Sequence, residues 1–208
     1  MKVQLNQVGK RFKYEWIFRG IDREFQSGQS YAIQGPNGSG KSTFLKILSG
    51  HLSPSKGKIS FYQDERTIDI NQVYQSISYA APYIDLIEDF TLKEAIDFHR
   101  RFKPLLEGLS TKDLIRILNF EKSTHKAVKY FSSGMKQRLK LVLALCSRAD
   151  LILLDEPGTN LDQQGIEWYR SMVERFYRDR LLIIASNVKA DFDFCDQHLN
   201  ILDYKKKA

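Results

Sequence analysis

The residues best suited to chemistry in this sequence form a glycine-rich run that ends in a lysine and a hydroxyl. Gly35 to Ser42 reads GPNGSGKS and fits the pattern GxxxxGK[ST]. Glycines let a backbone curl until several amide N–H groups point at one anion. Lys41 adds a compact positive charge for terminal phosphates, and the Ser42 hydroxyl can ligate Mg²⁺. The run predicts a nucleotide-phosphate site built from Gly35, Asn37, Gly38, Ser39, Gly40, Lys41, Ser42 and Thr43.

Two consecutive carboxylates supply the second half of this chemistry. Asp155 and Glu156 directly follow the run Leu151–Leu154, in which every residue is apolar. Such a run is typical of a parallel strand buried on both faces, so both carboxylates should lie at the strand's carboxyl end. Asp155 could hold a metal ion through its water shell, and Glu156 could orient or deprotonate an attacking water. The alternative is an ordinary surface pair that closes a strand.

The phosphate-binding run needs a strand before it and a helix after it. Residues 31–33 are a short apolar strand, and residues 44–48 predict a helix that Gly50 stops. Residues 2–8 alternate polar and apolar side chains and predict a half-buried strand, and residues 21–25 predict another. Beyond Glu156, a helix over 163–178 and a buried strand over 181–185 complete an α/β core.

The middle of the chain changes character. Thr91 and Glu94 form a capping box that predicts a helix to about Lys103, and Ser110 with Asp113 opens a second helix through Ile117. Residues 91–149 are therefore expected to be mostly helical. We predict one domain over 1–208: residues 1–82 and 150–208 form the core with an antiparallel β subdomain at the N-terminus, and about 83–149 form an inserted helical subdomain.

A third motif identifies the family that this pattern resembles. Phe131–Arg138 reads FSSGMKQR and looks like the LSGGQ signature of ATP-binding cassette (ABC) ATPases. With residues 153–157 and 159–162 behind it, the chain is similar to that family over nearly its full length. The resemblance implies a P-loop NTPase fold with a mainly parallel sheet, ATP and Mg²⁺ as cofactors, and a head-to-tail dimer that encloses two ATP molecules.

The same resemblance assigns further residues. It implies that Ser132 and Gly134 contact the γ-phosphate held by a partner copy, and that Asp162 lies in the loop that crosses the dimer interface. It places Phe12 where the family stacks an aromatic ring on adenine, although Tyr14 and Trp16 are close enough to take that role and Phe12 could instead belong to the core.

Three departures from the family pattern bear on turnover. Pro82 stands where the family has a glutamine that contacts Mg²⁺ and water, and Asn187 stands where it has a histidine that contacts the γ-phosphate. Ser133 and Met135 replace a glycine and a glutamine of the signature. An asparagine can donate to phosphate but cannot carry an imidazolium charge. We therefore predict a slow ATPase. Its catalytic residues would be Lys41, Glu156 and Asn187, and its metal ligands would be Ser42 and Asp155.

Composition excludes several other classes of protein. The 208 residues carry a net charge of +7 and 27% charged side chains, which excludes wholesale disorder. The two cysteines are far apart and belong to no metal-binding pattern, so a reduced, structural role is expected. No run approaches the length of a membrane span, and the first residues lack the apolar core of a signal peptide.

The stretch from Lys122 to Arg148 contains basic residues but no acidic one. It could be a solvated face of the protein, or it could be a surface that binds an anion.

Together these features predict the ATPase subunit of a membrane transporter, working through separate transmembrane permease subunits on the cytoplasmic face of the inner or plasma membrane. The permease would dock around residues 83–90, where Tyr83, Ile84, Leu86 and Ile87 offer apolar contacts, unless this loop packs internally. Two alternatives stay open: a nucleotide-gated regulatory module with very slow hydrolysis, and a soluble ABC protein that acts on nucleic acid or ribosomes. No nucleic-acid partner is expected, because only the basic balance supports one.

Overall fold

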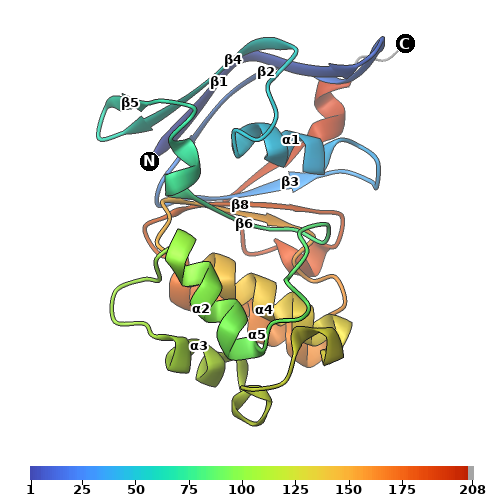
Figure 1. The fold of residues 1–208 in the computed structure, drawn as a ribbon. Helices are drawn as coiled ribbons and strands as arrows, with labels where there is room; N and C mark the ends of the chain where they lie inside the picture. The colour runs from blue at the N-terminus through green and yellow to red at the C-terminus, as the bar shows by residue number, and fades with distance from the viewer. Residues whose placement is uncertain (206–208) are drawn as a thin grey trace.

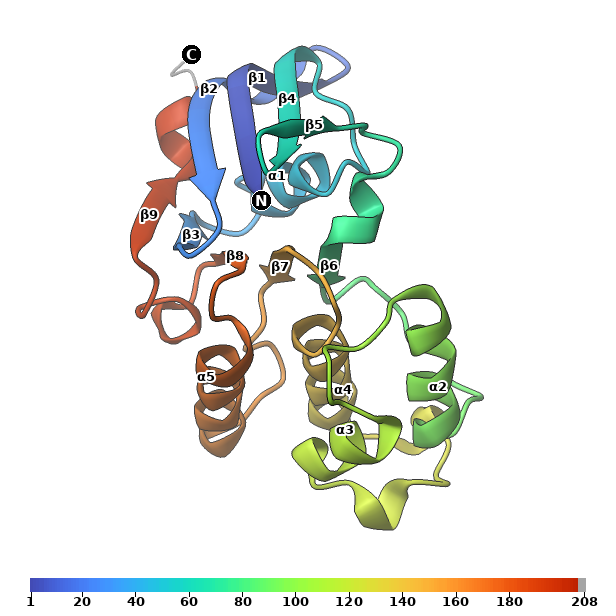
Figure 2. The same ribbon diagram turned by 90° about the vertical axis from the view of Figure 1, so that its left-hand side faces the viewer.

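A computed structural model describes residues 1–205 and places them in three layers (Figure 1). An antiparallel sheet has the strand order β2-β1-β4-β5, and a five-stranded parallel sheet has the order β6-β7-β8-β3-β9. Helix α1 packs between the two sheets, α4 and α5 lie on the far face of the parallel sheet, and α2 and α3 lie on the other side of α4 from α5 (Figure 2). The predicted α/β core with an antiparallel β subdomain and a helical insertion is confirmed.

The strands are β1 (Lys2–Phe12), β2 (Glu15–Gln26), β3 (Ser30–Gln34), β4 (Lys56–Gln63), β5 (Arg66–Ile68), β6 (Ile77–Ala80), β7 (Leu151–Asp155), β8 (Leu181–Ser186) and β9 (Gln197–Asn200). The α-helices are α1 (Lys41–Leu48), α2 (Leu92–Phe102), α3 (Thr111–Leu118), α4 (Ser133–Leu145) and α5 (Gln163–Phe176). Short 3₁₀ turns cover Val73–Ser76, Glu121–Ser123, Val128–Tyr130, Lys189–Asp191 and Ile201–Tyr204.

The parallel sheet divides the hydrophobic interior into two cores because successive strand residues face opposite sides. Leu151 and Leu153 of β7 face α1 and the antiparallel sheet, whereas Ile152 and Leu154 face the helical layer. Every residue of β7 and β8 is buried. This burial on both faces explains why the sequence of β7 is continuously apolar rather than alternating.

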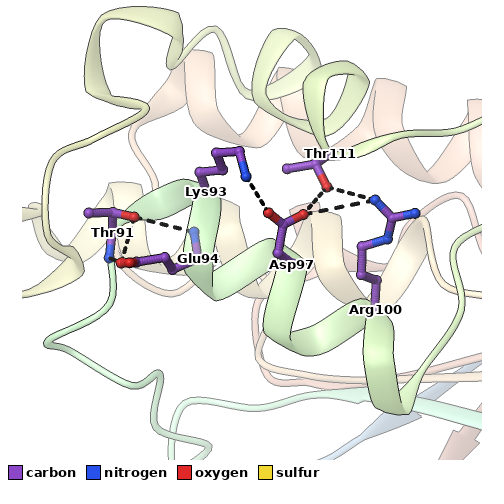
Figure 3. Close-up of polar contacts among 6 residues, drawn as sticks. All are labelled: Thr91, Lys93, Glu94, Asp97, Arg100 and Thr111. Carbon is purple, nitrogen blue, oxygen red and sulfur yellow. Dashed lines mark hydrogen bonds and ion pairs between the residues drawn. The ribbon is translucent and has the colours of Figure 1, made fainter.

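Both capping boxes form as predicted. Thr91 caps α2: its hydroxyl accepts a hydrogen bond from the Glu94 amide at 3.3 Å, and the Glu94 carboxylate accepts one from the Thr91 amide at 2.8 Å. Ser110 and Asp113 repeat the arrangement at α3. Figure 3 shows the α2 cap beside the contacts that join α2 to α3.

A side-chain network fixes α3 against α2. Asp97 accepts from Lys93 Nζ at 2.6 Å and from the buried Thr111 hydroxyl at 2.5 Å, and Arg100 donates to that hydroxyl at 3.2 Å (Figure 3). These contacts join the first two helices of the helical layer.

One sequence expectation needs correction, and three strands were not predicted. The expected helix to Arg178 ends at Phe176, because Arg178 adopts a left-handed φ of 38° and the Arg180 amide closes a turn on the Tyr177 carbonyl. The break at residues 103–110 between α2 and α3 is the predicted one, and two short 3₁₀ turns lie between α3 and α4. Pro104 cannot donate to a continuing helix, and Leu105 pairs with Ser147 instead. Strands β4, β5 and β9 had no predicted counterpart.

Both cysteines are free and buried, as expected. Burial raises the pKa of each thiol to about 12, so both stay protonated near neutral pH. A reactive or metal-binding thiolate is therefore not available at either position.

Burial of His99 predicts a measurable sensitivity to acid. Its Nε2 lies 2.8 Å from the Ser147 hydroxyl, which donates to the Leu143 carbonyl, and burial together with Lys103 lowers the pKa of His99 to about 4. In the unfolded chain His99 binds a proton near pH 6.5, whereas in the folded chain it does so only near pH 4. The contribution of His99 to stability is therefore present above pH 6.5 and is lost as the pH falls toward 4. Between pH 7 and pH 5 the wild type should lose about 2 kcal/mol more unfolding free energy than His99→Gln. Urea unfolding at both pH values measures this difference, and equal losses would contradict it.

Candidate functional site

The phosphate loop, Gly35–Ser42, connects the buried strand β3 to α1. Lys41 is buried, and its Nζ donates to the Gly35 carbonyl at 2.9 Å and to the Pro36 carbonyl at 3.3 Å. The ammonium group thus lies inside the loop. Phosphate oxygens placed there would be stronger acceptors than these neutral carbonyls, because both the donor and the acceptor would then carry charge.

The loop leaves the amino end of α1 open to an anion. Gly40 precedes the helix with a left-handed φ of 107°, and a Cβ there would lie 2.4 Å from Ile17 of β2. No acidic residue occupies the first turn of α1, so its free amides and dipole are not already neutralised. Asn37 and Gly38 are exposed at the tip, Thr43 is half-buried in the helix, and the Ser39 hydroxyl is buried without a hydrogen-bond partner among the described residues.

Asp155 ends β7 beside the start of α1. Its side chain is buried, and neither carboxylate oxygen accepts a hydrogen bond from residues 1–205. Burial raises the pKa of Asp155, while the nearby Ser42 hydroxyl and the Lys41 charge oppose that shift. A buried carboxylate with both oxygens free beside a serine hydroxyl offers the hard oxygen ligands that Mg²⁺ prefers, with the remaining positions left to water or phosphate.

No group of three or more His, Cys, Asp and Glu side chains in residues 1–205 is arranged to bind a metal ion on its own. A divalent cation at Asp155 would thus need ligands from outside the protein. This matches the usual behaviour of Mg²⁺, which keeps waters and substrate phosphates rather than filling a cage of side chains.

Glu156 and Asn187 lie at the ends of neighbouring strands and border one hollow of about 330 Å³. Glu156 has an unusual left-handed φ of 46°, held by its amide donating to the Ala185 carbonyl at 2.7 Å. Asn187 is exposed, and its Nδ2 donates to Asn37 Oδ1 of the phosphate loop at 3.1 Å. The fold therefore brings Asn187 to the phosphate loop and places Glu156 at the border of the adjoining hollow.

The signature segment, Phe131–Arg138, lies at the start of α4. Ser132 caps the helix by accepting from the Met135 amide at 3.2 Å, and Ser132 and Ser133 are exposed. A Cβ on Gly134 would lie 2.9 Å from the Asn160 carbonyl, so this glycine allows two segments to approach closely.

The signature segment and the phosphate loop do not share a pocket. Ser132, Gly134 and Asp162 border a hollow of about 570 Å³, together with Arg138 and Trp168, and neither Lys41 nor Ser42 reaches it. Asp162 also borders the smaller hollow of Glu156, and it caps α5 by accepting from the Gly165 amide at 2.7 Å. Within one copy, the sequence-predicted residues thus separate into two surfaces.

Two side chains that connect this region were not singled out from the sequence. The buried Gln137 donates through Nε2 to the Pro157 carbonyl at 2.8 Å and joins α4 to the turn that follows Glu156. The guanidinium of Arg138 stacks on Trp168 at 4.3 Å and on Phe120 at 5.5 Å. The only sequence signal for either was its place inside the signature segment.

The three aromatic candidates near the N-terminus differ in their surroundings. Phe12 is half-exposed, with Lys10 Nζ 5.3 Å from its ring centre, and Tyr14 is almost fully exposed. Trp16 is covered by two guanidinium groups, from Arg11 and Arg19, at 5.7 and 5.9 Å. Phe12 and Tyr14 therefore have free ring surface, and much of the Trp16 ring is already covered.

The segment after β6 also differs from expectation. Pro82 is exposed, and its carbonyl accepts from Lys140 Nζ at 3.0 Å. Ile84, Leu86 and Ile87 border an apolar hollow of about 720 Å³ between β6, α2 and α4. Tyr83 does not border that hollow. It borders a separate one of about 380 Å³ with Lys46 and Tyr79, on the side of Asp155.

Comparison with known proteins identifies the family. Residues 18–159 match the family model described as "ABC transporter". The chain is similar to the ABC transporter ATP-binding protein YcbN of Bacillus subtilis, with 28% identity over 92% of this chain and 63% of the relative. It is 32% identical to the Nod factor export ATP-binding protein I of Burkholderia thailandensis over 99% of this chain and 69% of the relative. The chain thus spans about two thirds of the length of these relatives.

A solved structure has the same fold. The ATP-binding cassette MJ0796, in a dimeric post-hydrolysis state bound to ADP and Pi, superposes with a TM-score of 0.81 at 20% identity, over 95% of this chain and 93% of that one. No helix within residues 1–205 has both the length and the apolarity needed to cross a membrane. The family model and the identity to the Nod factor export protein confirm the resemblance found in the motifs: the chain belongs to the ABC transporter family, as an ATP-binding cassette.

Proposed function

We propose that this cassette hydrolyses ATP with Mg²⁺ and drives transport through transmembrane permease subunits. The observation that carries the proposal is the buried Asp155 carboxylate, whose oxygens lack partners beside Ser42 and the phosphate loop. A carboxylate is expensive to bury unpaired, so its retention at this position favours a cation as the missing partner.

Each side chain then has a defined task. The loop amides and Lys41 bind the phosphates, and Ser42 and Asp155 hold Mg²⁺, which neutralises charge on the phosphate oxygens when bound. Glu156 accepts a proton from the attacking water, whose oxygen bonds to the γ-phosphorus as the bond to ADP breaks. Asn187, already in contact with the phosphate loop, donates a neutral hydrogen bond to the γ-phosphate.

A second copy of the chain completes the site in this proposal. Ser132 and Gly134 border a surface that the phosphate loop of the same copy does not reach. The first turn of α4 has no acidic residue, so its amides can meet the nucleotide held by the other copy. The MJ0796 cassette, which has the same fold, is a dimer with ADP and Pi bound, and this supports a dimer for the present chain. Asp162 would lie at the contact between copies, and either Phe12 or Tyr14 would stack on adenine.

The transmembrane partner would dock on the hollow of about 720 Å³ formed by Ile84, Leu86 and Ile87 with α2 and α4. Phe98 and Phe102 of α2 line its wall and are exposed, with Arg101 and Lys103 beside them. This surface fits an amphipathic helix that has apolar and acidic side chains. The assignment of the Burkholderia relative to export supports a transport role, and the cassette would then lie on the cytoplasmic face of the membrane.

Pro82 and Asn187 favour one second candidate, a nucleotide-gated regulatory module that turns over very slowly. Pro82 cannot supply the side-chain acceptor that the family pattern has at its position, and Asn187 cannot supply the positive charge of the family's histidine. Steady-state ATPase activity of the purified chain with Mg²⁺ separates the two. Measurable turnover supports the transporter ATPase, whereas tight ATP binding without turnover, even in the presence of the permease, supports the gated module.

Asn187→His should raise the turnover rate about tenfold, because an imidazolium stabilises charge on the γ-phosphate better than an amide does. The affinity for ATP should change by less than threefold. Lys189→His is the matched control, since it adds an imidazole two residues away and outside the hollow of Glu156. A rate for Asn187→His no higher than that of the control would show that the missing imidazole does not limit turnover.

A further inference from the structure

Three hydroxyl groups surround the Asp155 carboxylate. Ser42 comes from the start of α1, Tyr79 from β6, and Tyr83 from the segment that follows β6. Strand β6 lies next to β7 with Tyr79 paired to Leu153, two residues before Asp155, so the sheet brings the tyrosine ring to the carboxyl end of β7. Both tyrosine hydroxyls lie close enough to Asp155 for its charge to act on them.

The Tyr83 ring is held from two sides. Its hydroxyl shares a hydrogen bond with the Tyr79 hydroxyl, and the two rings pack edge to face with centres 6.3 Å apart. On the other side, Lys46 Nζ lies 4.2 Å from the centre of the Tyr83 ring, within cation–π distance. These contacts hold the Tyr83 hydroxyl beside the Tyr79 hydroxyl, near Asp155.

The hydroxyl is also accessible and protonated. Tyr83 is 45% exposed and borders an open hollow of about 380 Å³, so water reaches it. A phenol hydroxyl can both donate and accept a hydrogen bond at neutral pH. The preceding residue, Pro82, has no polar side chain with which to do this.

The carboxylate and the hydroxyl do not bond directly, since neither Asp155 oxygen accepts a hydrogen bond from the described residues. We propose that Tyr83 is a positioning residue for the metal: its hydroxyl, braced by Tyr79, orients a water in the shell of the Mg²⁺ that Asp155 and Ser42 hold. This inference rests on the proposed ATP and Mg²⁺ site and adds a residue to it from outside the motifs.

Tyr83→Phe tests the assignment because it removes only the hydroxyl and keeps the ring on Lys46. Tyr74→Phe is the matched control. Tyr74 borders the same hollow, and its hydroxyl contacts Gln75 rather than Asp155. Binding of a fluorescent ATP analogue is titrated with Mg²⁺, and binding of Mn²⁺ to the protein–nucleotide complex is followed by electron paramagnetic resonance. Thermal unfolding without nucleotide reports whether the fold is retained.

Loss of one water-mediated hydrogen bond should raise the Mg²⁺ concentration at half-saturation about fivefold in Tyr83→Phe. It should weaken Mn²⁺ binding to the same extent and leave metal-free nucleotide affinity within twofold. A Tyr83→Phe midpoint equal to that of Tyr74→Phe would overturn the role of Tyr83 while leaving the proposed function intact. If nucleotide binding by the wild type did not depend on the Mg²⁺ concentration, both the metal site and the role of Tyr83 would be overturned.

Discussion

Glu156→Gln should reduce ATP turnover at least a hundredfold and leave ATP affinity nearly unchanged. The amide has almost the same shape as the carboxylate but cannot accept a proton from water, and a positioned general base contributes about 10²- to 10⁴-fold to a rate. The backbone at this position is held by the bond from its amide to the Ala185 carbonyl, which the substitution does not alter. Steady-state phosphate release and equilibrium nucleotide binding measure the two quantities separately.

The same variant reports on assembly. With hydrolysis blocked, the ATP-bound state persists, so Glu156→Gln with MgATP should sediment as a dimer under conditions in which the nucleotide-free protein is monomeric. Glu174→Gln is the control, because Glu174 is exposed on α5 and borders neither hollow. Turnover that survives in Glu156→Gln at more than a tenth of the wild-type rate would remove Glu156 from its role as base.

Asp155→Asn should have opposite effects on stability and on function. In the nucleotide-free protein it removes the charge of a buried carboxylate whose oxygens accept no hydrogen bond from the described residues, so the unfolding free energy should rise by about 1–3 kcal/mol. The neutral amide is a poor ligand for Mg²⁺, so turnover should fall at least a hundredfold and MgATP should stabilise the variant no more than ATP with chelator does. Urea unfolding under the three conditions measures the stability changes, and steady-state phosphate release measures turnover.

Asp191→Asn provides the contrast for this prediction. Asp191 is equally buried, but it accepts a hydrogen bond from the Ser186 hydroxyl at 2.6 Å. Its replacement should lower the unfolding free energy, since a charge-assisted hydrogen bond is lost. If Asp155→Asn also destabilised the nucleotide-free protein, the carboxylate would already be satisfied in the fold, and the argument for a metal ion at this position would fail.

The parts of this molecule that follow local rules were predictable from sequence. The capping boxes at Thr91 and Ser110 depend on side chains three residues apart, and the burial of β7 on both faces is apparent from its uninterrupted apolar run. Strand β4 carried a partial signal, with apolar Ile59 and Phe61 at alternate positions. The polar residues of β9 gave none, because an edge strand of the parallel sheet is specified by its neighbour rather than by its own composition.

In the candidate site, too, some positions follow from local sequence and others depend on the tertiary fold. The positions of Lys41, Ser42 and Asp155 follow from motifs that are contiguous in the chain. The position of Tyr83 depends on β6 pairing with β7 and on a lysine from α1, segments far apart in the sequence. Composition alone favoured the apolar ring of Tyr83 as a docking contact, and only the tertiary arrangement brings its hydroxyl near Asp155. Likewise, the contact between Asn187 and Asn37 joins residues that no local pattern relates.

The buried bond from Gln137 to the Pro157 carbonyl has a consequence for how the sequence can vary. It connects the beginning of α4, which would face one nucleotide in the proposed dimer, to the turn after Glu156, which would face the other. A shift of α4 would therefore be transmitted to that turn. We expect a standard signature grafted onto Ser133 and Met135 to perturb the turn at Pro157 as well, so the two segments would need to be exchanged together.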